Sequence, residues 1–216
     1  MKVFKFGGGV LKDAEAIRRM TDIVRSEKEL ICVVSAFNKM TNAFEKLVGR
    51  SRGAVESHIR EIEVFHYAIT KELLEDPVTS WEMMILPLFN ELRVVIEENL
   101  DQAYDKNYDQ VVSYGEILST TIISMYWKEI GLIHQTWDAS KMIITDASYR
   151  SGRVNWELCE EQKRLKPGED EDLGVGIVLT QGFIGGTVDG YRTTLGREGS
   201  DYTAAVLGSL YEAEEV

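Results

Sequence analysis

The chain has 216 residues, of which 44% are hydrophobic, so it can bury a substantial core. Its formal net charge of −12 argues against a nucleic acid or an anionic membrane as a partner. Its cysteines, Cys32 and Cys159, are far apart, so we expect no disulfide framework and a reducing, cytoplasmic location. We also expect no signal peptide and no membrane span, because no apolar run is long enough.

The N-terminal residues predict a strand, a glycine turn and a helix. Residues 2–6 have a strand pattern and lead into three glycines, and residues 13–25 carry apolar side chains at helical spacing. Glycine lets backbone N–H groups approach oxygen closely, so such a turn often cradles phosphate. The P-loop ending is missing, and Lys12 stands at the third glycine position of the dinucleotide fingerprint. On these residues alone, Lys5 is better interpreted as a solvated lysine at a strand end.

A second strand is predicted at residues 29–35, where continuous apolar residues indicate burial on both faces of a parallel sheet. A helix should follow, with Thr41 as its N-cap. Alternating strands and helices predict a doubly wound sheet, in which ligands gather at the carboxyl ends of the strands. Gly7, Ser35 and Gly182 all fall at such ends, so the sequence predicts one shared site there.

Residues 51–107 predict helices only, arranged as a helical hairpin against the sheet domain. Two apolar stripes at helical spacing support this, separated by a break at Pro77. Their members are Val55, Ile59, Ile62, His66, Ile69 and Leu73 in the first stripe, and Trp81, Met84, Ile85, Leu88, Leu92, Val95 and Ile96 in the second. His66 is interpreted as a packed core histidine, and no histidine has the companions that a zinc site requires.

A further helix is predicted over much of residues 109–130, begun or interrupted near Gly115. Glu116 lies beside this glycine among apolar residues. Such a carboxylate is either an exposed turn residue or a ligand for an ammonium group, and the residues alone do not decide between the two.

The following elements are expected to be short. Strands are predicted at residues 132–137 and 141–145, a turn and a short helix within 150–165, and a strand at 176–179. Residues 167–172 form a charged loop, which we interpret as solvated because its acidic spacing misses the EF-hand pattern.

Residues 193–201, Thr-Thr-Leu-Gly-Arg-Glu-Gly-Ser-Asp, precede a predicted helix. Ser200 or Asp201 is expected to be its N-cap, so the positive end of the helix dipole would face this loop. Hydroxyls, a guanidinium and glycines beside a helix N-terminus suit an anion. Composition alone favours a simpler interpretation, a capped turn between two core elements.

Four stretches in the same order resemble the motifs of aspartokinases, in the amino-acid kinase family. They are Lys-Phe-Gly-Gly at 5–8, Val-Val-Ser-Ala at 33–36 with Thr-Asn at 41–42, Ser-Tyr-Gly-Glu-Ile-Leu-Ser at 113–119, and the segment 193–201. The resemblance implies an α/β fold with a doubly wound, mostly parallel sheet flanked by helices. Residues 1–216 would be the N-terminal, amino-acid-binding lobe, with a helical excursion at about 51–107. The nucleotide-binding half and the ACT domains would be absent.

The resemblance also implies a reaction, the transfer of the γ-phosphoryl group of ATP to the side-chain carboxylate of L-aspartate, a first step towards lysine, threonine and methionine. Lys5 would contact the transferred group, and Asp201 would orient that lysine. Gly7, Gly8 and Gly9 would offer backbone N–H groups to phosphate oxygens. Mg²⁺ would bridge the nucleotide phosphates, held largely by the missing half.

For the amino acid, the resemblance implies that Arg197 pairs with a carboxylate and that Glu116 binds the ammonium group. The remaining pocket residues would be Ser35, Thr41, Phe183 and Ser200. Three positions depart from the family pattern. Gly9 and Val10 replace hydroxyl residues, and Glu198 replaces a glycine, which affects phosphate handling more than aspartate recognition.

Two alternatives are kept open. One is another amino-acid kinase, acting on glutamate or acetylglutamate. Two segments argue against it, Thr41-Asn42 and Gly115-Glu116. The other is a non-catalytic module that binds an amino acid. If the chain is the aspartokinase lobe, we expect it to fold alone, to phosphorylate no aspartate, and to self-associate through an uncovered sheet edge, as a homo-oligomer.

Overall fold

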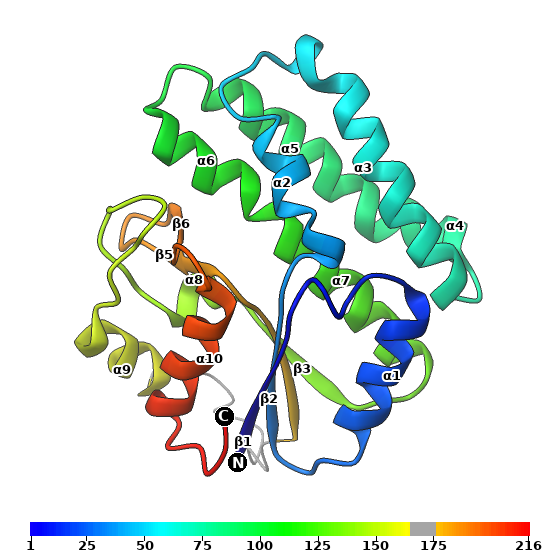
Figure 1. Cartoon of the computed structure of the whole chain (residues 1–216), viewed down its shortest axis with the longest axis vertical. Helices are drawn as coiled ribbons and strands as arrows, with labels where there is room; N and C mark the ends of the chain where they lie inside the picture. The colour runs from blue at the N-terminus through cyan, green and yellow to red at the C-terminus, as the bar shows by residue number, and fades with distance from the viewer. Residues whose placement is uncertain (165–175) are drawn as a thin grey trace.

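The computed structural model describes residues 1–164 and 176–216, so the predicted charged loop at 167–172 lies outside the described residues. In the described part a four-stranded parallel sheet runs through the centre, with strand order β1-β2-β4-β3 (Figure 1). Its strands are β1 (Lys2–Phe6), β2 (Leu30–Val34), β3 (His134–Trp137) and β4 (Ile177–Gln181).

Helices cover both faces of this sheet, as a doubly wound fold requires. Every residue of β2 is buried, and alternate side chains point to opposite faces. Cys32 packs in a cluster with α1 (Ala14–Arg25) and α7 (Tyr114–Glu129). Ile31 packs in a second cluster with the helices α8 (Ala139–Met142), α9 (Trp156–Arg164) and α10 (Gly199–Leu210). The predicted fold class is therefore confirmed.

The helical excursion gathers beyond the carboxyl end of the sheet (Figure 1). It contains α2 (Thr41–Glu45), α3 (Arg52–Leu73), α4 (Pro77–Ser80), a π-helical turn η2 (Trp81–Ile85), α5 (Leu86–Glu98) and α6 (Tyr104–Val112). All members of the first predicted stripe are buried on α3. In the second stripe, the prediction that Met84 is buried is wrong. Its side chain is 47% exposed, and Phe89 is buried instead. The π-turn adds a residue to one turn and so shifts the buried face.

Two local predictions are wrong. The strand expected at 141–145 does not form: Lys141 and Met142 end α8, which the Asp138 side chain caps by accepting a hydrogen bond from Ser140 N, and Ile144 and Thr145 form only isolated β-bridges. Thr41 is not an N-cap, because the residue before it, Met40, already has helical backbone angles. A 3₁₀ turn, η1 (Phe37–Lys39), leads directly into α2 and leaves no extended cap position.

Two features complete the fold. A hairpin of β5 (Ile184–Gly186) and β6 (Arg192–Thr194) follows β4 and leads into α10. On the outer side of β1, Val3 N donates to Glu215 O at 2.9 Å, so the last residues cover part of that sheet edge.

Among the described residues, no helix combines the length and apolar character needed to cross a bilayer.

Candidate active site

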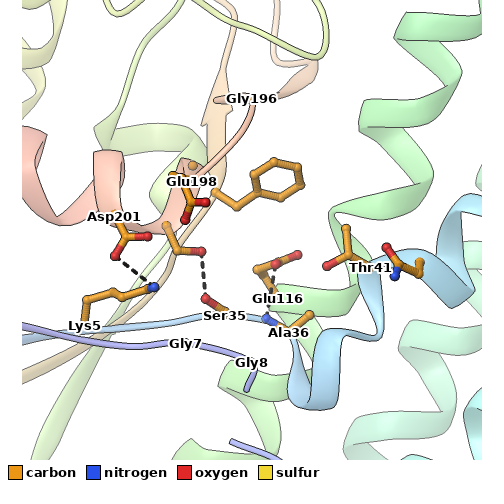
Figure 2. Close-up of a pocket in the computed structure, with 14 residues that line it drawn as sticks. Lys5, Gly7, Gly8, Ser35, Ala36, Thr41, Glu116, Gly196, Glu198 and Asp201 are labelled. Carbon is orange, nitrogen blue, oxygen red and sulfur yellow. Dashed lines mark hydrogen bonds and ion pairs between the residues drawn. The ribbon is translucent and has the colours of Figure 1, made fainter. Parts of the chain in front are cut away.

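A pocket of about 420 Å³ opens at the carboxyl ends of β1, β2 and β4. The strand ends converge because the sheet hydrogen bonding continues past them: Ser35 N donates to Phe6 O at 3.1 Å, and Gly182 N donates to Val34 O at 2.8 Å. The lining residues are Lys5, Gly7, Gly8, Ser35, Ala36, Thr41, Asn42, Glu116, Phe183, Gly196, Glu198, Gly199, Ser200 and Asp201 (Figure 2). Most of the predicted site residues are therefore brought together.

One side of the pocket carries an ion pair. Lys5 Nζ lies 2.9 Å from Asp201 Oδ1, and Figure 2 shows both side chains on the side of the pocket away from Glu116 and Thr41. Gly7 leaves room for the lysine, because a Cβ at that position would lie 3.1 Å from Lys5 Nζ. The Lys5 side chain is 24% exposed, so its charge is held in one place and still reaches the pocket.

The first turn of α10 forms the next part of this side. The helix begins at Gly199, after Glu198 in a left-handed conformation, so neither Ser200 nor Asp201 is its N-cap as predicted. Ser200 Oγ instead accepts a hydrogen bond from Ser35 Oγ at 2.8 Å. A Cβ at Gly182 would lie 2.6 Å from Ser200 Cβ, so glycine lets the helix dock on the end of β4. Its positive end faces the pocket.

Glu116 occupies the opposite side and is 2% exposed. Its Oε1 accepts a hydrogen bond from Ala36 N at 3.1 Å, whereas its Oε2 is buried with no hydrogen-bond partner among the described residues. Burial raises the pKa of the Glu116 carboxyl to about 8. Gly115 permits this arrangement, because a Cβ there would lie 2.9 Å from Ala36 Cβ. A buried carboxylate oxygen without a donor is a strong acceptor for a cation that enters the pocket.

Phe183 also lines the pocket. Its backbone takes a left-handed φ of 67°, and its N–H donates to Thr203 Oγ1 at 2.9 Å. Gly199 allows the close approach, because a Cβ there would lie 2.5 Å from the Phe183 ring. The ring therefore has a fixed place against α10.

Two predicted site residues are not among the residues that line the pocket. The Arg197 side chain is 95% exposed, and its Nε lies 3.8 Å from Glu198 Oε1. Gly9 lies in the glycine turn but is exposed, and its neighbour Val10 is exposed as well. Sequence reasoning also missed the role of Ala36, whose N–H donates to Glu116 across the pocket floor. A backbone donor of this kind leaves no trace in residue type.

Comparison with known proteins agrees with this geometry. The model of the amino acid kinase family matches residues 1–216. The chain belongs to the amino acid kinase family. Among family members, it is 31% identical over 215 residues to the aspartokinase of Chlamydia pneumoniae, covering 99% of this chain and 46% of that protein. It is 32% identical over 216 residues to lysine-sensitive aspartokinase 3 of Escherichia coli K12, covering 99% and 47%. The chain thus spans about half the length of these curated relatives.

Solved structures of the amino acid kinase family confirm the fold. Aspartokinase III of E. coli in complex with aspartate and ADP matches with a TM-score of 0.87 and 32% identity, over 99% of this chain and 47% of that one. The same enzyme in complex with lysine and aspartate matches with a TM-score of 0.87 and 31% identity, with equal coverage.

Proposed function

We propose that this chain carries the amino-acid-binding lobe of an aspartate kinase. The observation that carries the proposal is the buried, unpaired Oε2 of Glu116 on one side of a pocket whose other side holds Lys5 and the N-terminus of α10. An amino acid with an acidic side chain offers one cationic and two anionic groups, which suits a pocket divided in this way. The similarity to aspartokinases, one of them solved with aspartate and ADP, supports aspartate as the substrate.

In this proposal the ammonium group of aspartate binds Glu116 and supplies the donors that Oε2 lacks. A nearby positive charge favours the ionised carboxyl, so binding lowers the pKa of Glu116 towards its ordinary range. Arg197 turns in from solvent and pairs with a carboxylate of the substrate. Ser35, Thr41, Phe183 and Ser200 form the walls that orient it.

The phosphoryl side would work mainly by position and charge. A side-chain carboxylate oxygen of aspartate bonds to the γ-phosphorus of ATP while the bond from that phosphorus to the β–γ bridging oxygen breaks, and ADP leaves with that oxygen. Lys5, held by Asp201, stabilises the charge on the transferred group. Gly7, Gly8 and, in the first turn of α10, Ser200 offer N–H groups to its oxygens, since the N–H groups of Gly199 and Asp201 already donate to Gly196 O and Glu198 O.

Mg²⁺ commonly accompanies nucleotide phosphates, but the described part of the chain offers no set of protein ligands for it. No group of three or more His, Cys, Asp or Glu residues there could hold a metal ion. Asp201, the acidic group beside the phosphoryl position, is already paired with Lys5. The ion would therefore have to be held by nucleotide phosphates and by groups outside these residues.

Calorimetric titration of the purified chain with L-aspartate tests this proposal, with L-glutamate and N-acetyl-L-glutamate as matched competitors. We expect saturable binding of L-aspartate, and weaker binding of both competitors, because one is longer and the other has no ammonium group. Preference for either competitor would overturn the choice of substrate. A coupled assay for ADP, run in parallel, should detect no aspartate-dependent turnover by the chain alone.

The same titration with ATP present separates a kinase lobe from a module that only binds an amino acid. Nucleotide phosphates near Lys5 and Gly7 would meet the bound aspartate, so a kinase lobe should show an aspartate affinity that depends on ATP. An affinity that stays the same at every ATP concentration would favour the non-catalytic module.

A further inference from the structure

Asp109, near the end of α6, lies outside the pocket and is fully buried. Its carboxylate accepts three hydrogen bonds. Oδ2 accepts from Arg150 N and from Thr194 N, both at 2.9 Å, and Oδ1 accepts from Thr194 Oγ1 at 2.7 Å. Burial raises the pKa of Asp109 to about 6, although these hydrogen bonds act in the opposite direction. The fold thus keeps a buried carboxyl hydrogen-bonded to donors from two separate segments, the loop at Arg150 and strand β6.

The neighbouring residue strengthens the same connection. Gln110 Nε2 donates to Arg192 O at 2.7 Å, and Arg192 N donates to Gln110 Oε1 at 3.3 Å. The side-chain amide therefore pairs with β6 as a neighbouring strand would. Together, Asp109 and Gln110 attach β6 to helix α6, which belongs to the helical excursion rather than to the sheet domain.

This attachment lies immediately before residues 195–201, the segment that supplies one part of the pocket lining. Two residues after Thr194, the chain reaches Gly196, which lines the pocket with a φ of 78°. A Cβ at Gly196 would lie 3.3 Å from Arg150 O, and Gly152 N donates to Thr194 O at 2.9 Å. The loop that contains Arg150 is therefore the surface against which Gly196 turns, and Asp109 binds that loop and β6 at once.

The other side of the pocket continues from the same helix. After a break at Ser113, α6 leads into α7, whose first turn carries Glu116. Asp109 thus joins the segment that carries Glu116 to the segment that carries Gly196, Ser200 and Asp201. No other described side chain accepts hydrogen bonds from both β6 and the Arg150 loop.

We propose that Asp109 is a positioning residue that sets the separation between the Glu116 side of the pocket and the loop at 196–201. It touches no ligand itself. It acts by holding Thr194 and Arg150, and through them the loop. The ligand in this proposal is the amino acid of the proposed function, on which it rests, but the arrangement of the loop can be measured without any ligand.

Three variants separate this role from plain stability. Asp109→Ala removes all three hydrogen bonds. Asp109→Asn can keep them, because its amide oxygen accepts from both N–H groups and its amide nitrogen donates to Thr194 Oγ1. Ile69→Ala, in the buried stripe of α3 away from the pocket, is the matched control for a general loss of stability.

The measurements are hydrogen exchange and L-aspartate affinity. For Asp109→Ala we expect faster exchange at residues 195–201 than elsewhere and an affinity lower by about tenfold or more, because small displacements of binding groups are costly. Asp109→Asn should restore affinity to within about threefold of the parent chain, because its amide can make the same three contacts. Ile69→Ala should lower Tm and leave the affinity unchanged.

The proposal is overturned if Asp109→Ala lowers Tm as Ile69→Ala does, while affinity and exchange at 195–201 stay at parent values. If Asp109→Ala does not fold, Thr194→Val removes only the hydroxyl contact, and unchanged exchange at 195–201 in that variant would equally count against it. If the parent chain binds no L-aspartate, the proposed function fails, and the exchange data still decide the role of Asp109.

Discussion

Glu116 and Arg197, the two charged residues that the proposed function gives to the amino acid, differ in how far the fold prepares them. Glu116 is buried, has one hydrogen-bond donor and lacks a partner for its second oxygen before any ligand arrives. Arg197, assigned to the same amino acid, is almost fully exposed and weakly paired with Glu198. The buried group carries a desolvation cost in the empty protein, whereas the exposed group must lose side-chain freedom when it binds. In the proposed function, one contact would therefore be prepared by folding, and the other would form only with the ligand.

This difference predicts that replacing Glu116 and replacing Arg197 have different effects on the stability of the protein without ligand. Removing the charge of Glu116, whose second oxygen has no partner, should leave the empty protein as stable or more stable, while binding is lost. Removing an exposed group should leave stability unchanged. The variants below test this contrast, from the largest expected effect to the smallest.

Replacing Glu116 with Gln should have the largest effect on binding. The amide can still accept the hydrogen bond from Ala36 N, but it no longer offers a charge to the ammonium group. A charge-assisted hydrogen bond contributes about 1.5–3 kcal/mol, so L-aspartate should bind roughly 10- to 150-fold more weakly by calorimetry. Tm should stay the same or rise. Unchanged aspartate affinity in this variant would remove Glu116 from the ammonium site.

Replacing Arg197 with Ala should weaken L-aspartate binding by roughly tenfold, because a contact to a charged group is partly offset by ordering an exposed side chain. Tm should not change, because the side chain contacts little in the empty protein. Arg197→Lys is the matched control, since it keeps the charge and loses the two-pronged geometry, and it should recover only part of the affinity. A Tm lowered by several degrees in Arg197→Ala would show that this residue is also prepared by folding.

The buried carboxyl of Glu116 also predicts a dependence of stability on pH. Its pKa is raised from 4.5 to about 8 in the folded chain, so above pH 4.5 the unfolded state loses its proton while the folded state keeps it. Stability from this group is therefore fully present below pH 4.5 and is lost as pH rises to about 8. The raised pKa of Asp109 acts in the same direction, over the range from 3.8 to about 6.

Urea unfolding of the parent chain and Glu116→Gln at pH 5.5 and 8.5 measures this effect. The parent chain should lose more stability between these two values than the variant does, because the variant has no group to ionise there. Equal losses in both proteins would mean that the folded-state pKa of Glu116 lies near its ordinary value.

Much of this site was accessible from sequence because parallel strands place their carboxyl ends at one edge of the sheet. That rule alone brought Gly7, Ser35 and Gly182 together, and the structure confirms it. The resemblance to aspartokinases added Glu116 and Asp201, which periodicity could not have assigned to the pocket. The roles given to these residues remain predictions.

The predictions that failed depended on backbone geometry within a single turn. Met84 was placed in the buried stripe because the spacing assumed regular α-helix, and the π-turn at Trp81–Ile85 breaks it. Ser200 and Asp201 were predicted as caps from residue type, although Glu198 ends the preceding loop in a left-handed conformation. The contacts of Asp109 were also out of reach, because its partners lie 41 and 85 residues away in sequence.

Glu198 gives the smallest and most local test. Its φ of 57° is in the left-handed region, which costs a residue with a side chain roughly 1–2 kcal/mol relative to glycine. Glu198→Gly removes that cost but makes the unfolded chain more flexible, which offsets roughly 0.4–1 kcal/mol. The net gain should raise Tm by roughly 1–4 °C for a chain of this size. Glu198→Gln keeps the strained backbone and removes only a charge that is 72% exposed, so its Tm should stay near that of the parent. L-aspartate affinity should rise by less than about threefold in both variants, because exposed charges interact weakly. A Tm gain that is equal in Gln and Gly variants would assign the effect to the charge and not to the backbone.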